Sequence, residues 1–126
     1  IGGDFVLPRH FRNQCIYAEY RDVLSLGLDD GAVVERQRRM IEESGMPRNY
    51  GHAENNILYR RHRQPTIVAL DEEWWALIRD CSKRDQLSLM WLFWKRGWRV
   101  EDMMFENARM RTRDFLVFGH KGQTVK

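Results

Sequence analysis

The sequence has only two cysteines, Cys15 and Cys81, and they lie far apart in the chain. Neither belongs to a Cys-x-x-Cys pair or has a histidine-rich neighbourhood, so the sequence predicts neither a zinc site nor a disulfide framework. Each lies in an apolar stretch, where a buried free thiol is the expected state. Free thiols favour a reducing compartment, and we therefore predict a cytoplasmic location.

Long apolar segments are also missing. No apolar run reaches the ~18 residues that a membrane span needs, and no signal peptide is visible. The chain begins at Ile1 rather than at a methionine, so we interpret it as part of a longer protein. Internal repeats and Gly/Ser linkers are absent too, which predicts one continuous, partial domain over residues 1–126.

Several catalytic motifs are lacking. The sequence contains no Gly-x-Ser-x-Gly, no phosphate-binding loop of the Walker type, no His-Glu-x-x-His and no Gly-rich dinucleotide loop. It therefore offers no support for the chemistries that those motifs carry. An Asp-x-Asp pair is absent as well.

Charged and aromatic side chains, in contrast, are plentiful. Charged residues make up 31% of the chain with a formal net charge of +3, and acidic and basic residues are interspersed. This pattern indicates a solvated surface rather than a polybasic arm. A pI near 9.1 is compatible with anionic ligands such as nucleotide diphosphates or nucleic acid. The five tryptophans supply core material, but tryptophan also stacks on sugars and bases.

Hydrophobic periodicity predicts an α/β chain with the order helix, helix, strand, helix, helix, strand. Expected elements are a loop or short strand over residues 1–12, helices over about Cys15–Leu26, from Asp29 or Asp30 to Gly45, over Leu70–Cys81 and after Asp85, and strands over Asn55–His62 and Asp114–Phe118. Two strands are too few for a complete α/β sheet.

Two of these helix starts carry capping signals. Asp71 is a predicted N-cap, with Leu70 placed to pack against Trp75. Ser82 and Asp85 form a capping box, Ser-x-x-Asp, immediately before an apolar helix. That helix should be buried on nearly all sides and end at Gly97.

The first polar cluster is His10 with Arg12, followed by Tyr17 and Glu19. Residues two apart on an extended segment point to the same side, so His10 and Arg12 could bind an anionic group or a sugar hydroxyl together. A surface histidine beside a solvated arginine explains the pair equally well.

The second cluster consists of Glu54, Asn55 and Asn56, between Gly51-His52 and Arg60-Arg61-His62. Carboxylate and amide groups side by side suit recognition of neighbouring hydroxyls. An ordinary turn rich in Asn and Gly is the commoner explanation of such a segment.

The third cluster is Lys83, Arg84, Asp85 and Gln86, at the entry of the apolar helix. A buried helix whose start is this polar commonly faces a cleft, and its dipole favours anions. Helix capping alone would also account for Asp85.

The fourth cluster is His120 with Lys121 in a glycine-flanked loop. The histidine could bind a divalent metal ion, and the lysine could neutralise a phosphate. A histidine near a terminus is more often merely exposed.

Read in order, these segments resemble the glycosyltransferase-like domain family of plants and bacteria that was once catalogued as a domain of unknown function. The resemblance covers roughly residues 8–96, with a weaker echo at 114–121. It is carried by His10 with Arg12, CIYAE (15–19), the Gln37/Met40 helix ending in Gly45-x-Pro47, AENNILYRRH (53–62), EEWWALI (72–78) and SKRDQLSLMWLFWK (82–95).

The resemblance implies the C-terminal part of a GT-A fold that transfers a sugar from a nucleotide-sugar donor to a glycan or polysaccharide. By analogy, Asp85 and Gln86 would contact the transferred sugar at the reacting carbon. His120 would complete a Mn²⁺ (or Mg²⁺) site, and the metal would polarise the leaving diphosphate. The expected substrate contacts are His10, Arg12, Glu54, Asn55, Asn56, Lys83, Arg84 and Lys121. In full-length members the Asp-x-Asp pair and the nucleotide-binding half would lie upstream of Ile1.

Two alternatives stay open. A basic pI, abundant arginine and aromatic residues are also the ingredients of a nucleic-acid-binding module, although no known reader motif is present. A non-catalytic interaction domain that kept the family core is the other alternative.

Overall fold

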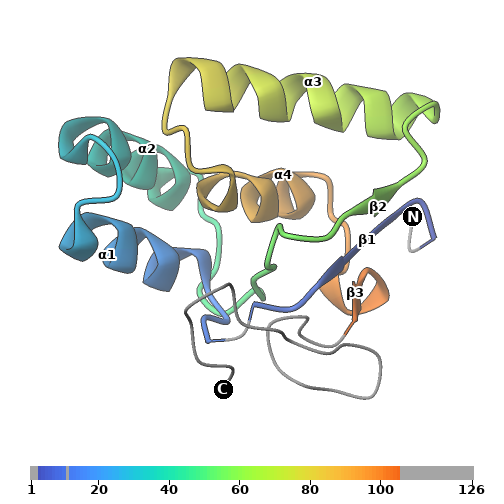
Figure 1. The fold of residues 1–126 in the computed structure, drawn as a ribbon, viewed down its shortest axis with the longest axis horizontal. Coiled ribbons are helices and arrows are strands. Elements are labelled where there is room, and N and C mark those ends of the chain that lie inside the picture. The colour runs from blue at the N-terminus through green and yellow to red at the C-terminus, as the bar shows by residue number, and fades with distance from the viewer. Residues whose placement is uncertain (1–2, 11, 106–126) are drawn as a thin grey trace, which may run out of the picture.

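The computed structural model describes residues 3–10 and 12–105 (Figure 1). Its elements are β1 (Phe5–Pro8), α1 (Ile16–Leu26), α2 (Gly31–Glu43), β2 (Tyr59–Arg60), α3 (Pro65–Asp80), a 3-10 helix (Asp85–Leu87), α4 (Leu89–Lys95), a second 3-10 helix (Val100–Asp102) and β3 (Met104–Phe105). The α/β class is confirmed, with helices predominating over short strands. The strand predicted over Asp114–Phe118 lies outside the described residues.

The strands form a small sheet in the order β2-β1-β3. Strand β1 pairs antiparallel with β2 and parallel with β3. Just after β1, Arg9 forms an isolated antiparallel bridge with Ala53, and the His10 amide donates to the His52 carbonyl at 2.9 Å. The end of β1 therefore lies against the segment that carries Glu54, which places His10 beside it.

Helix α4 lies at the centre of the molecule, between α3 and the strands (Figure 1). Its residues from Leu89 to Phe93 are all buried, as predicted. The ring of Phe93 meets Phe5 of β1 edge-on, with 5.2 Å between centroids. Gly97 ends the helix in the left-handed region at φ 70°, where glycine carries no Cβ penalty.

Helices α1 and α2 agree with the sequence patterns. The Asp30 carboxylate accepts the backbone N–H groups of Ala32 and Val33, so Asp30 is the N-cap of α2. No disulfide joins the two cysteines; Cys15 is buried and Cys81 is half-buried. None of the helices within residues 3–10 and 12–105 combines the length and hydrophobicity that crossing a bilayer requires.

The predicted cap at Asp71 is wrong. Helix α3 begins earlier, at Pro65, whose fixed φ suits the first helical position. Asp71 lies inside the helix and pairs with Arg60 at 2.8 Å. Leu70 is in the core while Trp75 is 61% exposed, so the two do not pack together as predicted.

The predicted capping box at Ser82 and Asp85 is also wrong. The Ser82 hydroxyl donates to the Asp29 carboxylate at 2.7 Å and accepts the Arg84 N–H at 3.1 Å. A 3-10 turn over Asp85–Leu87 intervenes, and α4 begins only at Leu89. The local pattern predicted that the Ser82 hydroxyl caps the following helix. It instead donates to the charged Asp29 carboxylate, which comes from another part of the fold.

Candidate functional site

The second and third polar clusters of the sequence meet in one pocket of about 280 Å³. The pocket is lined by Glu54, Asn55, Asn56, Lys83, Arg84, Asp85 and Gln86. Seven of the predicted site residues thus lie together, although 26 residues intervene in the sequence between Asn56 and Lys83.

A direct contact joins the two segments. Gln86 donates from Nε2 to Oε1 of Glu54 at 3.0 Å. The Glu54 backbone N–H donates to the carbonyl of Pro8 at 3.0 Å, which ties this side of the pocket to the end of β1. Glu54 is only 2% exposed, so a buried carboxylate lies at the inner end of the pocket.

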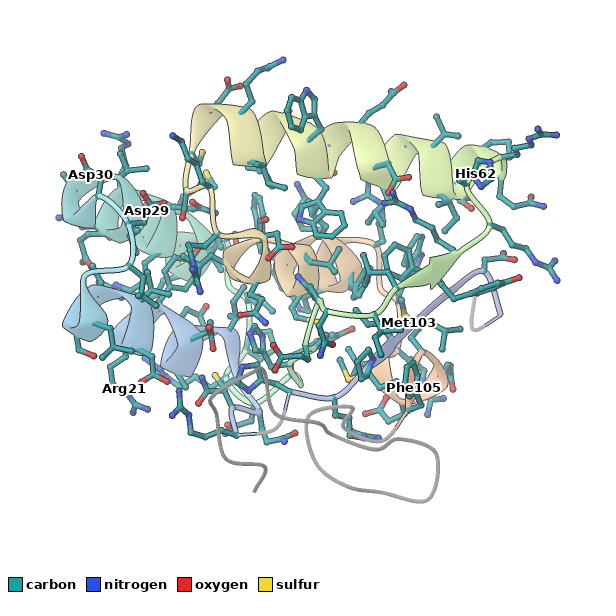
Figure 2. All side chains as sticks on the ribbon, in the orientation of Figure 1. Arg21, Asp29, Asp30, His62, Met103 and Phe105 are labelled. Atoms are coloured by element: carbon teal, nitrogen blue, oxygen red, sulfur yellow. The ribbon has the colours of Figure 1, made fainter. Side chains whose placement is uncertain are left out.

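The backbone of the other segment is fixed by side chains from three helices and the turn before α2. Asp29 accepts the Lys83 N–H, and Gln37 accepts the Ser82 N–H at 2.8 Å. The indole N–H of Trp74 reaches the Asp85 carbonyl at 3.4 Å, and the Tyr20 hydroxyl donates to the Leu87 carbonyl at 2.6 Å. Figure 2 shows Asp29 next to the connection between α3 and α4. Because these partners bind the backbone, the side chains of Lys83, Arg84 and Asp85 stay available to the pocket.

Those available groups are polar and of both signs. The side chains of Lys83, Arg84 and Asp85 make no hydrogen bond or ion pair with any residue that the structure describes. Both polar atoms of the Asn55 amide are buried without a hydrogen-bond partner within the described ranges. A buried amide left in this state costs free energy, so the Asn55 donor and acceptor need partners that the described chain does not supply.

Behind Glu54 lies His10, which is buried. Its Nδ1 accepts two backbone N–H groups, from Arg12 at 3.1 Å and Asn13 at 2.9 Å. The single proton of a neutral imidazole must then be on Nε2. This Nε2 lies 3.4 Å from Oε2 of Glu19 and 3.8 Å from Oε2 of Glu54. The Nε2–H group therefore faces both carboxylates at ion-pair distance.

This arrangement argues against a metal ion at His10. A ring nitrogen that keeps its proton has no lone pair for a metal, and the other nitrogen is occupied by backbone donors. In residues 3–10 and 12–105, no group of three or more His, Cys, Asp or Glu side chains is placed to hold a metal ion.

His52 completes this buried cluster. It is 1% exposed, and its Nε2 lies 3.8 Å from Oε2 of Glu19. Burial, and to a lesser degree the neighbouring His10, lowers the pKa of His52 from 6.5 to about 3. His52 is therefore neutral at physiological pH. No sequence pattern assigns a role to His52 or predicts the contact of Glu19 with His10, although Glu19 follows His10 in the first polar cluster.

The prediction that His10 and Arg12 point to the same side is wrong. His10 faces Glu19 and Glu54 in the interior, whereas the Arg12 guanidinium is largely exposed and pairs with Asp22 at 3.1 Å. The chain turns at His10 because the imidazole accepts the next backbone N–H groups, so the segment is not extended as assumed. Only His10 lies next to the pocket, through Glu54.

His120 and Lys121 lie outside the described residues. The Mn²⁺ (or Mg²⁺) site expected at His120 and the phosphate contact expected at Lys121 therefore stay predictions.

Comparisons with protein-family models, curated proteins and solved structures found no match.

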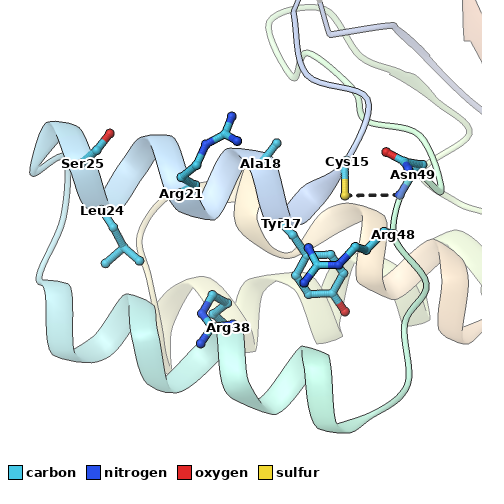
Figure 3. Close-up of a pocket in the computed structure, with 9 residues that line it drawn as sticks. All are labelled: Cys15, Tyr17, Ala18, Arg21, Leu24, Ser25, Arg38, Arg48 and Asn49. Carbon is cyan, nitrogen blue, oxygen red and sulfur yellow. Dashed lines mark hydrogen bonds between the residues drawn. The ribbon is translucent and has the colours of Figure 1, made fainter.

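A larger hollow of about 700 Å³ lies beside α1 and α2 (Figure 3). It is lined by Cys15, Tyr17, Ala18, Arg21, Leu24, Ser25, Arg38, Arg48 and Asn49. Its arginines do not converge on one point: Arg38 is held by Glu35 and Glu42, Arg48 stacks over the Tyr17 ring at 4.8 Å, and Arg21 extends away from both in Figure 3. We therefore place the candidate site at the smaller pocket.

Proposed function

We propose that the pocket formed by residues 54–56 and 83–86 binds the sugar of a nucleotide-sugar donor, and that the chain is the C-terminal, acceptor-side part of a glycosyltransferase-like domain of the GT-A type. One observation carries the proposal. Two polar segments far apart in sequence converge on a small pocket, where the Asn55 amide and the Asp85 carboxylate have no partner among the described residues.

The chemistry of the lining supports a carbohydrate. Each sugar hydroxyl can donate and accept, so it needs both kinds of partner in fixed positions. The Asn55 amide supplies a donor and an acceptor, and the Asp85 carboxylate supplies two further acceptor oxygens. A volume of about 280 Å³ is at the lower end for a ligand site, which suits one sugar unit rather than a whole nucleotide sugar.

The charges in the pocket suggest separate roles. Lys83 and Arg84 would attract the phosphate groups of the donor, with Arg84 able to bind an anion through two N–H groups. Asp85 would stabilise the positive charge that develops at the sugar carbon during transfer. Gln86 commits its Nε2 to Glu54, so its Oε1 would accept from a sugar hydroxyl.

The proposal also covers a metal ion and a cellular location. A divalent metal ion, Mn²⁺ or Mg²⁺, would depend on His120, with Lys121 at the diphosphate. The free thiols of Cys15 and Cys81 support a cytoplasmic location. Nucleic-acid binding has less support at this pocket, because the carboxylates of Glu54 and Asp85 balance the charges of Lys83 and Arg84 and leave no excess of positive charge for an extended phosphate backbone.

The test is direct binding to the full-length protein, which on this proposal also contains the nucleotide-binding half upstream of Ile1. UDP-glucose, UDP-galactose, UDP-N-acetylglucosamine and GDP-mannose are titrated by calorimetry, with and without Mn²⁺, against the wild type and the Asp85→Asn and Asn55→Ala variants. We expect at least one donor to bind, and each variant to weaken it about tenfold, which corresponds to about 1.4 kcal/mol. Asp80→Asn is the matched control, because Asp80 is exposed and pairs with Arg79 outside the pocket. Wild-type affinity in Asp85→Asn, or no binding of any donor, would reject the proposal.

A further inference from the structure

A second, smaller hollow lies on α3. It measures about 210 Å³ and is lined by Arg60, Asp71, Trp74, Trp75 and Ile78. The two adjacent tryptophans differ sharply in their surroundings: Trp74 is 7% exposed and belongs to the core, whereas Trp75 is 61% exposed. Other residues of α3 form its buried face, and the Trp75 indole has no packing role among the described residues.

The polar groups beside the indole are fixed in place. Arg60, at the end of β2, donates from Nη1 to Oδ1 of Asp71 at 2.8 Å. The hollow therefore combines one aromatic surface with guanidinium donors and carboxylate acceptors held by an ion pair. A sugar ring has the matching features, an apolar C–H face that stacks on an aromatic ring and hydroxyls at its edge that need donors and acceptors.

The charge of the hollow favours a neutral ligand. Arg60 and Asp71 cancel each other, so the hollow has no excess of positive charge for a phosphate backbone. A nucleic acid that stacked a base on Trp75 would lack the electrostatic part of its affinity here. The affinity of a neutral carbohydrate does not depend on such an electrostatic contribution.

The hollow also adjoins the candidate sugar pocket. Trp74 lines the hollow, and its indole N–H contacts the carbonyl of Asp85, a residue that lines the pocket. The contact between Trp74 and Asp85 thus connects the lining of the hollow with the lining of the pocket. A glycan bound in the hollow would have its next units near the reacting end of the pocket.

We propose that the hollow at Trp75 is a subsite for a neutral stretch of the acceptor glycan, bound by stacking on Trp75 and by hydrogen bonds to Asp71 and Arg60. This inference rests on the proposed function of the neighbouring pocket. It adds the substrate class on the acceptor side, and it assigns the specificity for that substrate to residues of β2 and α3.

The experiment observes the five indole N–H signals of the complete, ¹⁵N-labelled chain by NMR during titration with neutral hexasaccharides. Cellohexaose, xylohexaose and mannohexaose are the probes. The Trp75 signal is assigned from its loss in Trp75→Phe. We expect a saturable shift of this signal with at least one probe. Because the Trp75 variants lack this signal, calorimetry with the same probe measures their affinities, and we expect at least tenfold weaker binding in Trp75→Ala, with Trp75→Phe between the two.

Val68→Ala is the matched control, because Val68 is another exposed apolar residue of α3 and does not line the hollow. It should bind as the wild type does, and thermal melts should show that each variant folds. Wild-type affinity in Trp75→Ala, no shift with any hexasaccharide, or a Trp75 shift with oligouridylate alone would each overturn the subsite.

Failure of the subsite and failure of the proposed function can be told apart. Trp75→Ala should leave donor binding unchanged while it weakens hexasaccharide binding, because Trp75 does not line the donor pocket. If the hexasaccharide binds and no nucleotide sugar does, the subsite stands and the donor pocket is wrong. If donors bind at Asp85 and Trp75 stays silent, the pocket stands and the subsite is wrong.

Discussion

Gln86 and Glu54, 32 residues apart in sequence, are joined by a side-chain hydrogen bond of 3.0 Å at the inner end of the pocket. This contact defines the separation of the two segments that line it. Glu54 is buried, so its carboxylate depends on a few fixed donors, and Gln86 supplies one of them.

The Gln86→Glu variant tests this contact. It would place a second carboxylate about 3 Å from that of Glu54. Like charges so close in a buried site should lower the free energy of unfolding by about 1–3 kcal/mol at pH 8, and the loss should shrink near pH 5 as the pair takes up a shared proton. Urea unfolding at the two pH values measures this.

A swapped pair is the control for that prediction. In the double variant Glu54→Gln with Gln86→Glu, one amide and one carboxylate face each other again. Most of the stability at pH 8 should return. A double variant no more stable than Gln86→Glu alone would show that the two side chains do not interact as described.

The Asp29→Ala variant tests how the Lys83–Gln86 segment is fixed. The Asp29 carboxylate accepts from the Ser82 hydroxyl and the Lys83 N–H, and these bonds, with that from the Asp30 N–H, lower its pKa. We expect a loss of about 1–2 kcal/mol in the free energy of unfolding, because charged hydrogen bonds are lost at a partly exposed site. Ligand binding at the pocket should weaken too, although Asp29 does not line it.

The sign of the pH effect follows from the lowered pKa of Asp29. Its contribution to stability should be present at neutral pH and lost as the pH falls through its folded pKa. Asp102→Ala, an exposed acid in the second 3-10 helix, is the control and should change neither stability nor binding by much. If Asp29→Ala unfolds at the wild-type urea concentration, the anchoring role is wrong.

The sequence predicted local features well and long-range partners poorly. The start of α2 at Asp29 or Asp30, the burial of α4 and its end at Gly97 depend on neighbours within a few residues. All three predictions are confirmed, with Asp30 as the N-cap. Ser82 and Asp71 also carry good local signals. The two predictions are wrong for different reasons. Asp29, from another part of the fold, binds the Ser82 hydroxyl, and α3 already begins at Pro65, which leaves Asp71 inside the helix and paired with Arg60.

The candidate site shows the same division. The residues that line the pocket stood out because they crowd polar side chains at helix and strand ends. The residues that hydrogen-bond the backbone of the pocket did not stand out. Gln37, Tyr20 and Trp74 lie on apolar helix faces and look like ordinary core positions. Gln37 lies between the apolar residues Val34 and Ile41 on the buried face of α2, and a glutamine at such a position indicates a polar contact in the interior.

The buried His52 should make the protein sensitive to mild acid. Its folded pKa of about 3 lies below the ordinary value of 6.5, so between these values the unfolded chain binds a proton that the folded chain does not. Stability should therefore fall as the pH drops below about 6.5. We expect the urea midpoint to decrease from pH 7.5 to pH 5.5, a window above most carboxylate titrations.

Two variants separate His52 from the other histidines. His52→Gln should weaken the pH dependence even if it lowers stability overall, because glutamine does not titrate. His62→Gln is the matched control, since His62 is exposed. Figure 2 shows it just before the start of α3, on the opposite side of the molecule from Asp29. An unchanged pH slope in His52→Gln would contradict this prediction.

Gly51 precedes the segment that carries His52 and Glu54, and two separate constraints act on it. Its φ of 113° is one that side chains rarely adopt, and a Cβ there would lie 2.9 Å from Cγ2 of Val100. Gly51→Ala should therefore cost at least about 2 kcal/mol, from backbone strain and overpacking together. Pocket binding should weaken as well, because Gly51 donates to the Gln14 carbonyl and any shift moves the residues that follow it.

Gly45 separates the two causes. It has a φ of 92° but nothing within 4 Å of its Cβ position, so Gly45→Ala should cost only the strain, about 1 kcal/mol. Adding Val100→Ala to Gly51→Ala removes the clash, and the double variant should be more stable than the sum of the single effects predicts. Strict additivity would mean that the Val100 contact contributes nothing, and that the conformation of Gly51 alone makes the position intolerant.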